Sequence, residues 1–216
     1  MFWDLFDRPT LATYCAAALA LVAAPGPGQA LVLARTLQRG LRAGLLTSLG
    51  LNTGTLLHTL AAALGLSALL LTSATAFTIV KIAGAAYLVF LGIRTLLASR
   101  RSDTAGRTSV AAPEPSAVPS SRLLLHGAVT GVLNPKVAIF FLAFLPQFVR
   151  PERGAVLLQF LILGLILATL GVMGDSLVAV LAARAGSAGL AGRWRERVTG
   201  GVLVALGLRL AFLTRV

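Results

Sequence analysis

Charged residues are scarce in this chain, at 12% of 216 residues, whereas hydrophobic residues make up 57%. A soluble domain carries roughly 25% charged residues, so this shortage excludes an ordinary soluble protein. The mean hydropathy of +0.88 agrees with that exclusion. Helices of about 20 apolar residues joined by short loops would cross a bilayer roughly six times within this length. We therefore predict an all-α integral membrane protein with six transmembrane helices.

Acidic residues are scarcer still, because seven Asp and Glu stand against 19 Lys and Arg, a formal net charge of +12. In a soluble protein this excess would suggest nucleic acid as a partner. Here the basic residues occur in short clusters between apolar segments, with no basic face, so no nucleic-acid partner is expected. The single cysteine, Cys15, excludes an internal disulfide. No metal-ligand cluster, phosphate loop or nucleophile triad is present, and we predict no enzyme activity, no metal and no cofactor.

Apolar segments and polar punctuation define the organisation. The expected spans are about 10–34, 43–71, 77–98, 123–149, 154–183 and 198–213. Between the third and fourth lies a Pro- and Ser-rich stretch, 99–122, whose composition is typical of a flexible linker. It separates a first three-helix repeat, 1–98, from a second, 123–216. Since three crossings start the second half from the opposite side, repeats of this kind must be inverted, in a 3+3 arrangement.

Arginine clusters predict the orientation. The larger group lies in and beside the first, third and fifth loops: Arg35, Arg39, Arg42, Arg94, Arg100, Arg101, Arg107, Arg122, Arg184, Arg193, Arg195 and Arg197. The smaller group on the opposite side is Arg8, Arg150, Arg153 and Arg215. Because basic residues concentrate in cytoplasmic loops, the long linker is expected in the cytoplasm.

Helix-breaking residues interrupt two of the predicted spans. The first span carries Pro25–Gly28 in "AAPGPGQAL", and the fourth carries Asn134–Lys136 in "GVLNPKVAI". Proline removes a backbone donor and disrupts the preceding turn. At membrane depth such a break is tolerated where it is packed in protein or lines a cavity, and paired breaks in matching halves indicate a transporter site. We expect broken helices in spans 1 and 4 that face each other near the midplane; the alternative is a kink that serves packing alone.

Polar groups inside the spans add candidate functional residues. Asp175 is the only acid within any span, and Lys136 is an ionisable group deep in the fourth; such residues usually mark pathways. In the second span, Ser48, Asn52, Thr55 and Thr59 follow one helical stripe, flanked by His58. This stripe fits either the wall of a translocation path or hydrogen bonding between helices.

These residues resemble the LysE/RhtB family of bacterial amino-acid exporters. The matching segments are "APGPGQALVLARTLQRGLRAG", "GLNTG", "KIAGAAYLVFLGIR", "GAVTGVLNPKVAIFFLAFLPQFV" and "GGVLVALGLRL". The resemblance implies six transmembrane helices and efflux of basic, neutral or hydroxylated amino acids driven by the proton-motive force. Thr55 stands where many relatives have an acidic residue, so no role is transferred from that position.

The resulting prediction is a secondary active transporter of the bacterial inner membrane that exports an amino acid or close derivative, coupled to protons. The alternatives are efflux of a metal ion or another small solute, or a non-transport membrane scaffold. The predicted substrate-binding residues are Pro25, Gly26, Pro27, Gly28, Asn52, Thr55, Asn134, Pro135 and Lys136. Asp175 and Lys136 are predicted to couple protons. Glycines at four-residue spacing, such as Gly50 and Gly54, make a homodimer one further expectation, and membrane lipid is an expected partner.

Overall fold

The computed structural model describes residues 5–66 and 118–185, with isolated positions at 75, 79, 82, 90 and 93. Every regular element within these residues is helical, as the sequence predicts. The predicted span 198–213, and nearly all of the span 77–98 and of the linker 99–122, lie outside the described residues.

The first half of the described chain forms three consecutive helices. Helix α2 spans Arg8–Ala23, and α3 spans Pro27–Arg39. The Asp7 carboxylate begins α2 by accepting a hydrogen bond from the Thr10 N–H at 2.8 Å, which satisfies one of the free donors of the first turn. A single residue, Gly40, separates α3 from α4 (Leu41–Ala61), and its φ of +82° lies in the region that glycine adopts most readily.

The second half of the described chain begins with α7, Ser120–Val132, slightly before the predicted start at residue 123. It continues as α8 (Pro135–Ile139), the π-helical turn η2 (Phe140–Phe144) and the 3₁₀ turn η3 (Leu145–Phe148). A short 3₁₀ turn, η4 (Pro151–Arg153), precedes the long α9 (Val156–Ala185). A π-helical turn, η1 (Ala62–Leu66), extends α4.

Helix length and apolarity single out α9 as a membrane span. Its residues Val156–Arg184 have a mean hydropathy of 2.5 over the tested window, and within the described residues no other single helix is as suited to crossing a bilayer. The pair α2–α3 and the segment from α7 to η3 meet the same test when each is taken as one span, bent by 53° and 46°. Helix α4 falls short because its 21 residues include a buried polar set.

Glycines allow α4 and α7 to pack backbone against backbone. A Cβ at Gly50 would lie 2.2 Å from the Leu124 carbonyl oxygen, and one at Gly131 would lie 2.3 Å from the Leu51 carbonyl oxygen. Both distances are too short for any side chain, so the close approach requires glycine on both helices. The spacing that suggested a homodimer is therefore used within this chain, between α4 and α7.

Aromatic side chains fill the core between α2, the α8–η3 segment and α9. The Tyr14 hydroxyl donates a 2.7 Å hydrogen bond to the Leu163 carbonyl, and its ring packs edge-on against Phe148 with centroids 5.2 Å apart. Phe140 and Phe144 continue the cluster. Because the Tyr14 hydroxyl is bonded, the buried ring does not strand a polar group.

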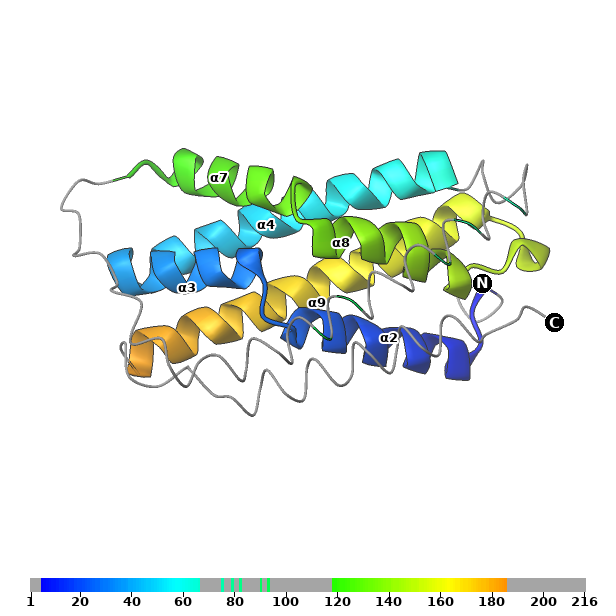
Figure 1. Cartoon of the computed structure of the whole chain (residues 1–216), viewed down its shortest axis with the longest axis horizontal. Helices are drawn as coiled ribbons and strands as arrows, with labels where there is room; N and C mark the ends of the chain where they lie inside the picture. Colours follow the sequence, from blue (N-terminus) through cyan, green and yellow to red (C-terminus); the bar gives the residue numbers. More distant parts are fainter. Residues whose placement is uncertain are drawn as a thin grey trace.

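Figure 1 shows the described helices running along one long axis, with the α2–α3 and α7–α8 connections both near the middle of that axis. Helix α9 packs against α2, α3 and α4. The α3–α4 turn lies at the same end of the molecule as the C-terminus of α9, and the start of α2 lies at the other end (Figure 1).

Candidate functional site

The connection between α2 and α3 leaves backbone carbonyls without helical donors. In an unbroken helix the Leu21 carbonyl would accept from residue 25, but Pro25 has no N–H. The last helical N–H of α2, that of Ala24, donates to the Ala20 carbonyl at 3.0 Å and to the Leu21 carbonyl at 3.2 Å, and the chain is extended at Ala24 and Gly26. The C-terminal carbonyls of α2 therefore need donors from elsewhere.

Lys136 supplies two of these donors from the other half of the chain. Its Nζ donates to the Leu21 carbonyl at 2.9 Å and to the Ala24 carbonyl at 2.8 Å. A cation at the C-terminus of a helix is also favoured by the helix dipole. The lysine is only 7% exposed, so these contacts replace water around a buried charge. The structure thus links the two breaks directly through one side chain.

Gln29 caps the same helix end and was missed by the sequence analysis. Its Nε2 donates to the carbonyl of Val22, from the first turn of α3. A glutamine in a first helical turn is ordinary, and the one signal available was its position directly after Pro27–Gly28 within an apolar span. Together, Gln29 and Lys136 donate hydrogen bonds to three carbonyls at the end of α2, those of Leu21, Val22 and Ala24.

The break between α7 and α8 is satisfied differently, by local contacts and by α4. The Asn134 side chain accepts from the Lys136 backbone N–H at 3.1 Å, so it caps the N-terminus of α8. His58 lies with Nε2 3.0 Å from the Val132 carbonyl oxygen at the end of α7, and its ring stacks on Phe141 with centroids 5.9 Å apart. His58, which flanks the polar stripe of α4, therefore contacts the second break.

Asp175 of α9 lies against Asn52 of α4. The Asn52 Nδ2 donates to Asp175 Oδ2 at 3.2 Å and to the Ser48 carbonyl at 2.9 Å. Its carbonyl oxygen lies over Gly171, where a Cβ would be 2.1 Å away. Asp175 is 8% exposed, so its carboxylate is held in a largely dry place by a neutral amide. The absence of a side chain at Gly171 is what lets Asn52 take this orientation.

One cavity of about 60 Å³ connects these features. Since a water molecule needs about 10–15 Å³ by this measure, there is room for several waters or for the polar head of a small solute. The residues that line it are Leu21, Val22, Gly28, Gln29, Leu51, Asn52, Thr55, Gly131, Asn134, Lys136, Val137, Leu167, Gly171 and Asp175. Of the residues predicted from sequence, Gly28, Asn52, Thr55, Asn134, Lys136 and Asp175 are in this set, and Pro25, Gly26, Pro27 and Pro135 are not.

The polar stripe of α4 divides between the cavity and helix packing. Asn52 and Thr55 line the cavity, whereas the Thr59 hydroxyl bonds back to the Thr55 carbonyl at 2.9 Å and its side chain lies against Gly164. Ser48 is fully buried, and its hydroxyl has no hydrogen-bond partner among the described residues. The stripe therefore lines the cavity at Asn52 and Thr55, bonds to another helix at Asn52 and packs against α9 at Thr59.

The lining contains charges of both signs within an otherwise apolar wall. Lys136 is its one cationic side chain and Asp175 its one acid, and five of its residues are leucine or valine. The N-terminus of the 13-residue helix α3 also opens on the cavity at Gly28 and Gln29, and such a terminus attracts anions. No group of three or more His, Cys, Asp or Glu suited to a metal ion occurs in the described part of the chain.

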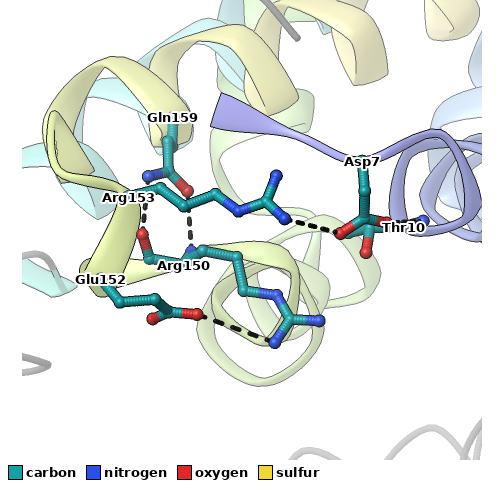
Figure 2. A network of polar contacts seen from close by, with 6 residues as sticks. All are labelled: Asp7, Thr10, Arg150, Glu152, Arg153 and Gln159. Carbon is teal, nitrogen blue, oxygen red and sulfur yellow. Dashed lines mark hydrogen bonds and ion pairs between the residues drawn. The ribbon is translucent and has the colours of Figure 1, made fainter. Parts of the chain in front are cut away.

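A polar network at the end of the molecule that carries the start of α2 fixes the turn before α9 (Figure 2). The buried Gln159 accepts from the Arg150 N–H at 2.7 Å and donates to the carbonyls of Arg150 and Gly154 at 2.9 and 2.7 Å. Arg153 forms an ion pair with Asp7 at 3.3 Å. The hydrogen bond from Thr10, with the nearby arginine charges, holds the pKa of Asp7 below its ordinary value.

The family follows from a comparison with known proteins. The family model described as LysE type translocator matches residues 19–214, nearly the whole chain. The chain belongs to this family. The resemblance drawn from the motifs of both breaks is thereby confirmed, and the activity named for the family is translocation.

Curated relatives extend this assignment. The uncharacterized membrane protein YrhP of Bacillus subtilis (strain 168) is 33% identical over 167 residues, 76% of this chain and 79% of YrhP. The leucine efflux protein of Salmonella typhimurium (strain LT2) is 32% identical over 137 residues, 63% of this chain and 62% of that protein. The homoserine/homoserine lactone efflux protein of the same strain is 34% identical over 142 residues, covering 65% and 64%. No solved structure matches the chain.

Proposed function

We propose that this translocator exports a neutral amino acid with an aliphatic side chain, or a close derivative, in exchange for protons. The observation that carries the proposal is the cavity between the two helix breaks, which offers one cationic side chain and one carboxylate within an apolar wall. A zwitterion with an uncharged side chain matches this set. A basic amino acid would bring a second positive charge, for which the described lining has no second acid.

The carboxylate of the substrate has its best partners at the α3 side of the cavity. The first-turn N–H groups of a helix have no intrahelical acceptors, and the dipole adds positive potential there. At the α8 side the Lys136 backbone N–H is already capped by Asn134 Oδ1, and α8 has only five residues. Of the two helix starts at the breaks, Pro27 in α3 and Pro135 in α8, the first is therefore favoured. The amide nitrogen of Asn134, which lies 3.6 Å from where a Cβ at Gly28 would be, adds a donor on the same side.

The ammonium group of the substrate has its partner across the cavity, at Asp175. The remaining lining is supplied by residues such as Val22, Leu51 and Leu167, which suit an aliphatic side chain. The names of two relatives, a leucine and a homoserine efflux protein, agree with a substrate that is uncharged beyond its zwitterionic head.

Proton coupling is assigned to Asp175, together with Lys136. These are the titratable side chains in the lining of the cavity, and each is buried. An exchanger needs a group whose proton affinity depends on whether substrate is bound, and the linkage between the two is reciprocal. A carboxylate that faces the substrate ammonium meets that requirement, because proton and ammonium compete for the same oxygens.

The two bent helix pairs support an inverted repeat of three spans each, with 1–98 and 123–216 as the halves and 99–122 as a linker. Each break places a proline at the first position of its second helix, Pro27 in α3 and Pro135 in α8. In Figure 1, α2–α3 and α7–α8 run in opposite directions along the long axis, as inversion requires. The arginine bias places the end with the α3–α4 turn in the cytoplasm of a bacterial inner membrane.

The experiment is efflux from proteoliposomes that contain the purified full chain, loaded with radiolabelled L-leucine, L-homoserine or L-lysine. We expect leucine and homoserine to leave against their gradients when a pH gradient is imposed, and protein-free vesicles to show neither. Equally fast export of L-lysine would contradict the substrate class. Export of leucine that ignores the pH gradient would contradict the coupling.

A further inference from the structure

We propose that Lys136 is the residue that selects for a free α-carboxylate, and that it does so by leaving the end of α2 when the substrate binds. Its ammonium would leave two backbone carbonyls and bind the substrate carboxylate instead. Substrate binding would thereby break the contact between Lys136 and the end of α2. This inference rests on the proposed function, since it requires an amino acid in the cavity.

The contacts of Lys136 in the substrate-free structure are the first step. Two acceptors of its Nζ, the carbonyls of Leu21 and Ala24, are neutral backbone groups; Pro25 removes the donor that a continuing α-helix would give the Leu21 carbonyl, which also accepts from the Ala24 N–H at 3.2 Å. The ammonium also lies beside Gly26, where a Cβ would be in ordinary contact with Nζ at 3.5 Å. The ammonium therefore lies directly against the backbone of the break, within the same cavity as the start of α3.

Charge decides which acceptor is preferred. An ammonium and a carboxylate attract each other as two full opposite charges, whereas a carbonyl offers only a dipole, and the low dielectric of a dry site strengthens this difference. A substrate carboxylate bound at the N-terminus of α3 would compete with the two backbone carbonyls as the acceptor for Lys136 Nζ. The primary amide of the same amino acid keeps the ammonium and the side chain but lacks this charge, so it should leave Lys136 on the carbonyls.

When Lys136 leaves the end of α2, the first break loses hydrogen bonds that hold it to α8. The α2 end would keep the Gln29 bond to the Val22 carbonyl but lose both bonds from α8. The link between the two breaks would then be open, and α2 could move relative to α8. In this arrangement the empty carrier is held by Lys136, and a substrate with a carboxylate releases it.

The first test compares binding of L-leucine and L-leucinamide by calorimetry to the purified full chain. The wild type should prefer leucine, and Lys136→Met should lower leucine affinity about tenfold or more, the loss expected for a charged hydrogen bond, so that the preference disappears. Gln29→Met is the matched control, because it removes a neutral donor from the same helix end. It should keep the preference for leucine even if both ligands bind more weakly.

Retention of the preference in Lys136→Met, or its equal loss in Gln29→Met, would overturn the inference.

A second measurement uses the wild type, should Lys136→Met fail to fold. The chain has two lysines, Lys81 and Lys136, so labelling with ζ-¹⁵N-lysine gives two ammonium signals in NMR. Leucine should shift the Lys136 signal and leucinamide should not, with Lys81 as the internal reference. Calorimetric binding of leucine with an unmoved Lys136 signal would refute the exchange while leaving export intact, whereas absence of binding and of export would refute the proposed function itself.

Discussion

Gly171 provides the sharpest perturbation of the cavity, because it controls Asn52 without touching a charge. A Cβ at this position would lie 2.1 Å from the Asn52 carbonyl oxygen, whereas ordinary contact begins at 3.4 Å. In Gly171→Ala the amide must therefore move by about 1.3 Å, the difference between these distances. The Asn52–Asp175 hydrogen bond is already 3.2 Å long, and a shift of this size breaks it.

The expected magnitude follows from that lost bond. A hydrogen bond to a charged group contributes about 1.5–3 kcal/mol, which corresponds to roughly 10- to 100-fold in binding. We expect Gly171→Ala to lower kcat/KM for leucine export by that factor, measured as initial efflux from proteoliposomes under a fixed pH gradient. The mechanism is loss of the amide that positions Asp175, since neither Asp175 nor Lys136 is changed.

Gly164→Ala is the matched control on the same helix. Its Cβ would also strike a polar side chain of α4, at 2.2 Å from Thr59 Cγ2, but Thr59 does not line the cavity. Both variants should lose a similar amount of thermal stability, while transport by Gly164→Ala should stay within about threefold of the wild type. Equal transport defects in the two variants would show that helix packing alone explains the effect, and would refute the positioning of Asp175 by Asn52.

Three further outcomes are expected. Asp175→Asn should abolish uphill export driven by a pH gradient but leave measurable counterflow, and full gradient-driven export by this variant would remove Asp175 from the coupling. Asp7→Ala should lower the midpoint of thermal unfolding at neutral pH by the equivalent of about 1 kcal/mol or less, because it removes a helix cap and an exposed ion pair with Arg153. Because the pKa of Asp7 is depressed in the folded state, this contribution is present above about pH 4 and lost as the pH falls, so the two proteins should converge in acid. Reporter fusions within 99–122 and at the C-terminus should report opposite compartments, and one shared compartment would contradict six spans.

The sequence predicted where the helices end. It did not predict which side chains form hydrogen bonds with those helix ends. Proline acts on its own turn, so Pro25 and Pro27 locate the end of α2 at Ala23 and the start of α3 from local chemistry alone. The donors that then satisfy the freed carbonyls come from Lys136, more than a hundred residues along the chain, and no local pattern encodes that pairing. The same limit applies to Asn52, whose partner on α9 depends on the crossing of two helices at Gly171.

The two breaks differ in the residue that follows the proline, and this difference gives the cavity between them its binding groups. After the proline that starts α3 comes Gly28, and after the proline that starts α8 comes Lys136. The glycine leaves the N-terminus of a 13-residue helix open to the cavity, while the second start is closed by Asn134. The lysine reaches back to the first break and adds a positive charge beside that open terminus. Two breaks of the same sequence would give two equivalent half-sites; a glycine in one and a lysine in the other bring an open helix N-terminus and an ammonium to the same cavity, to which α9 adds a carboxylate.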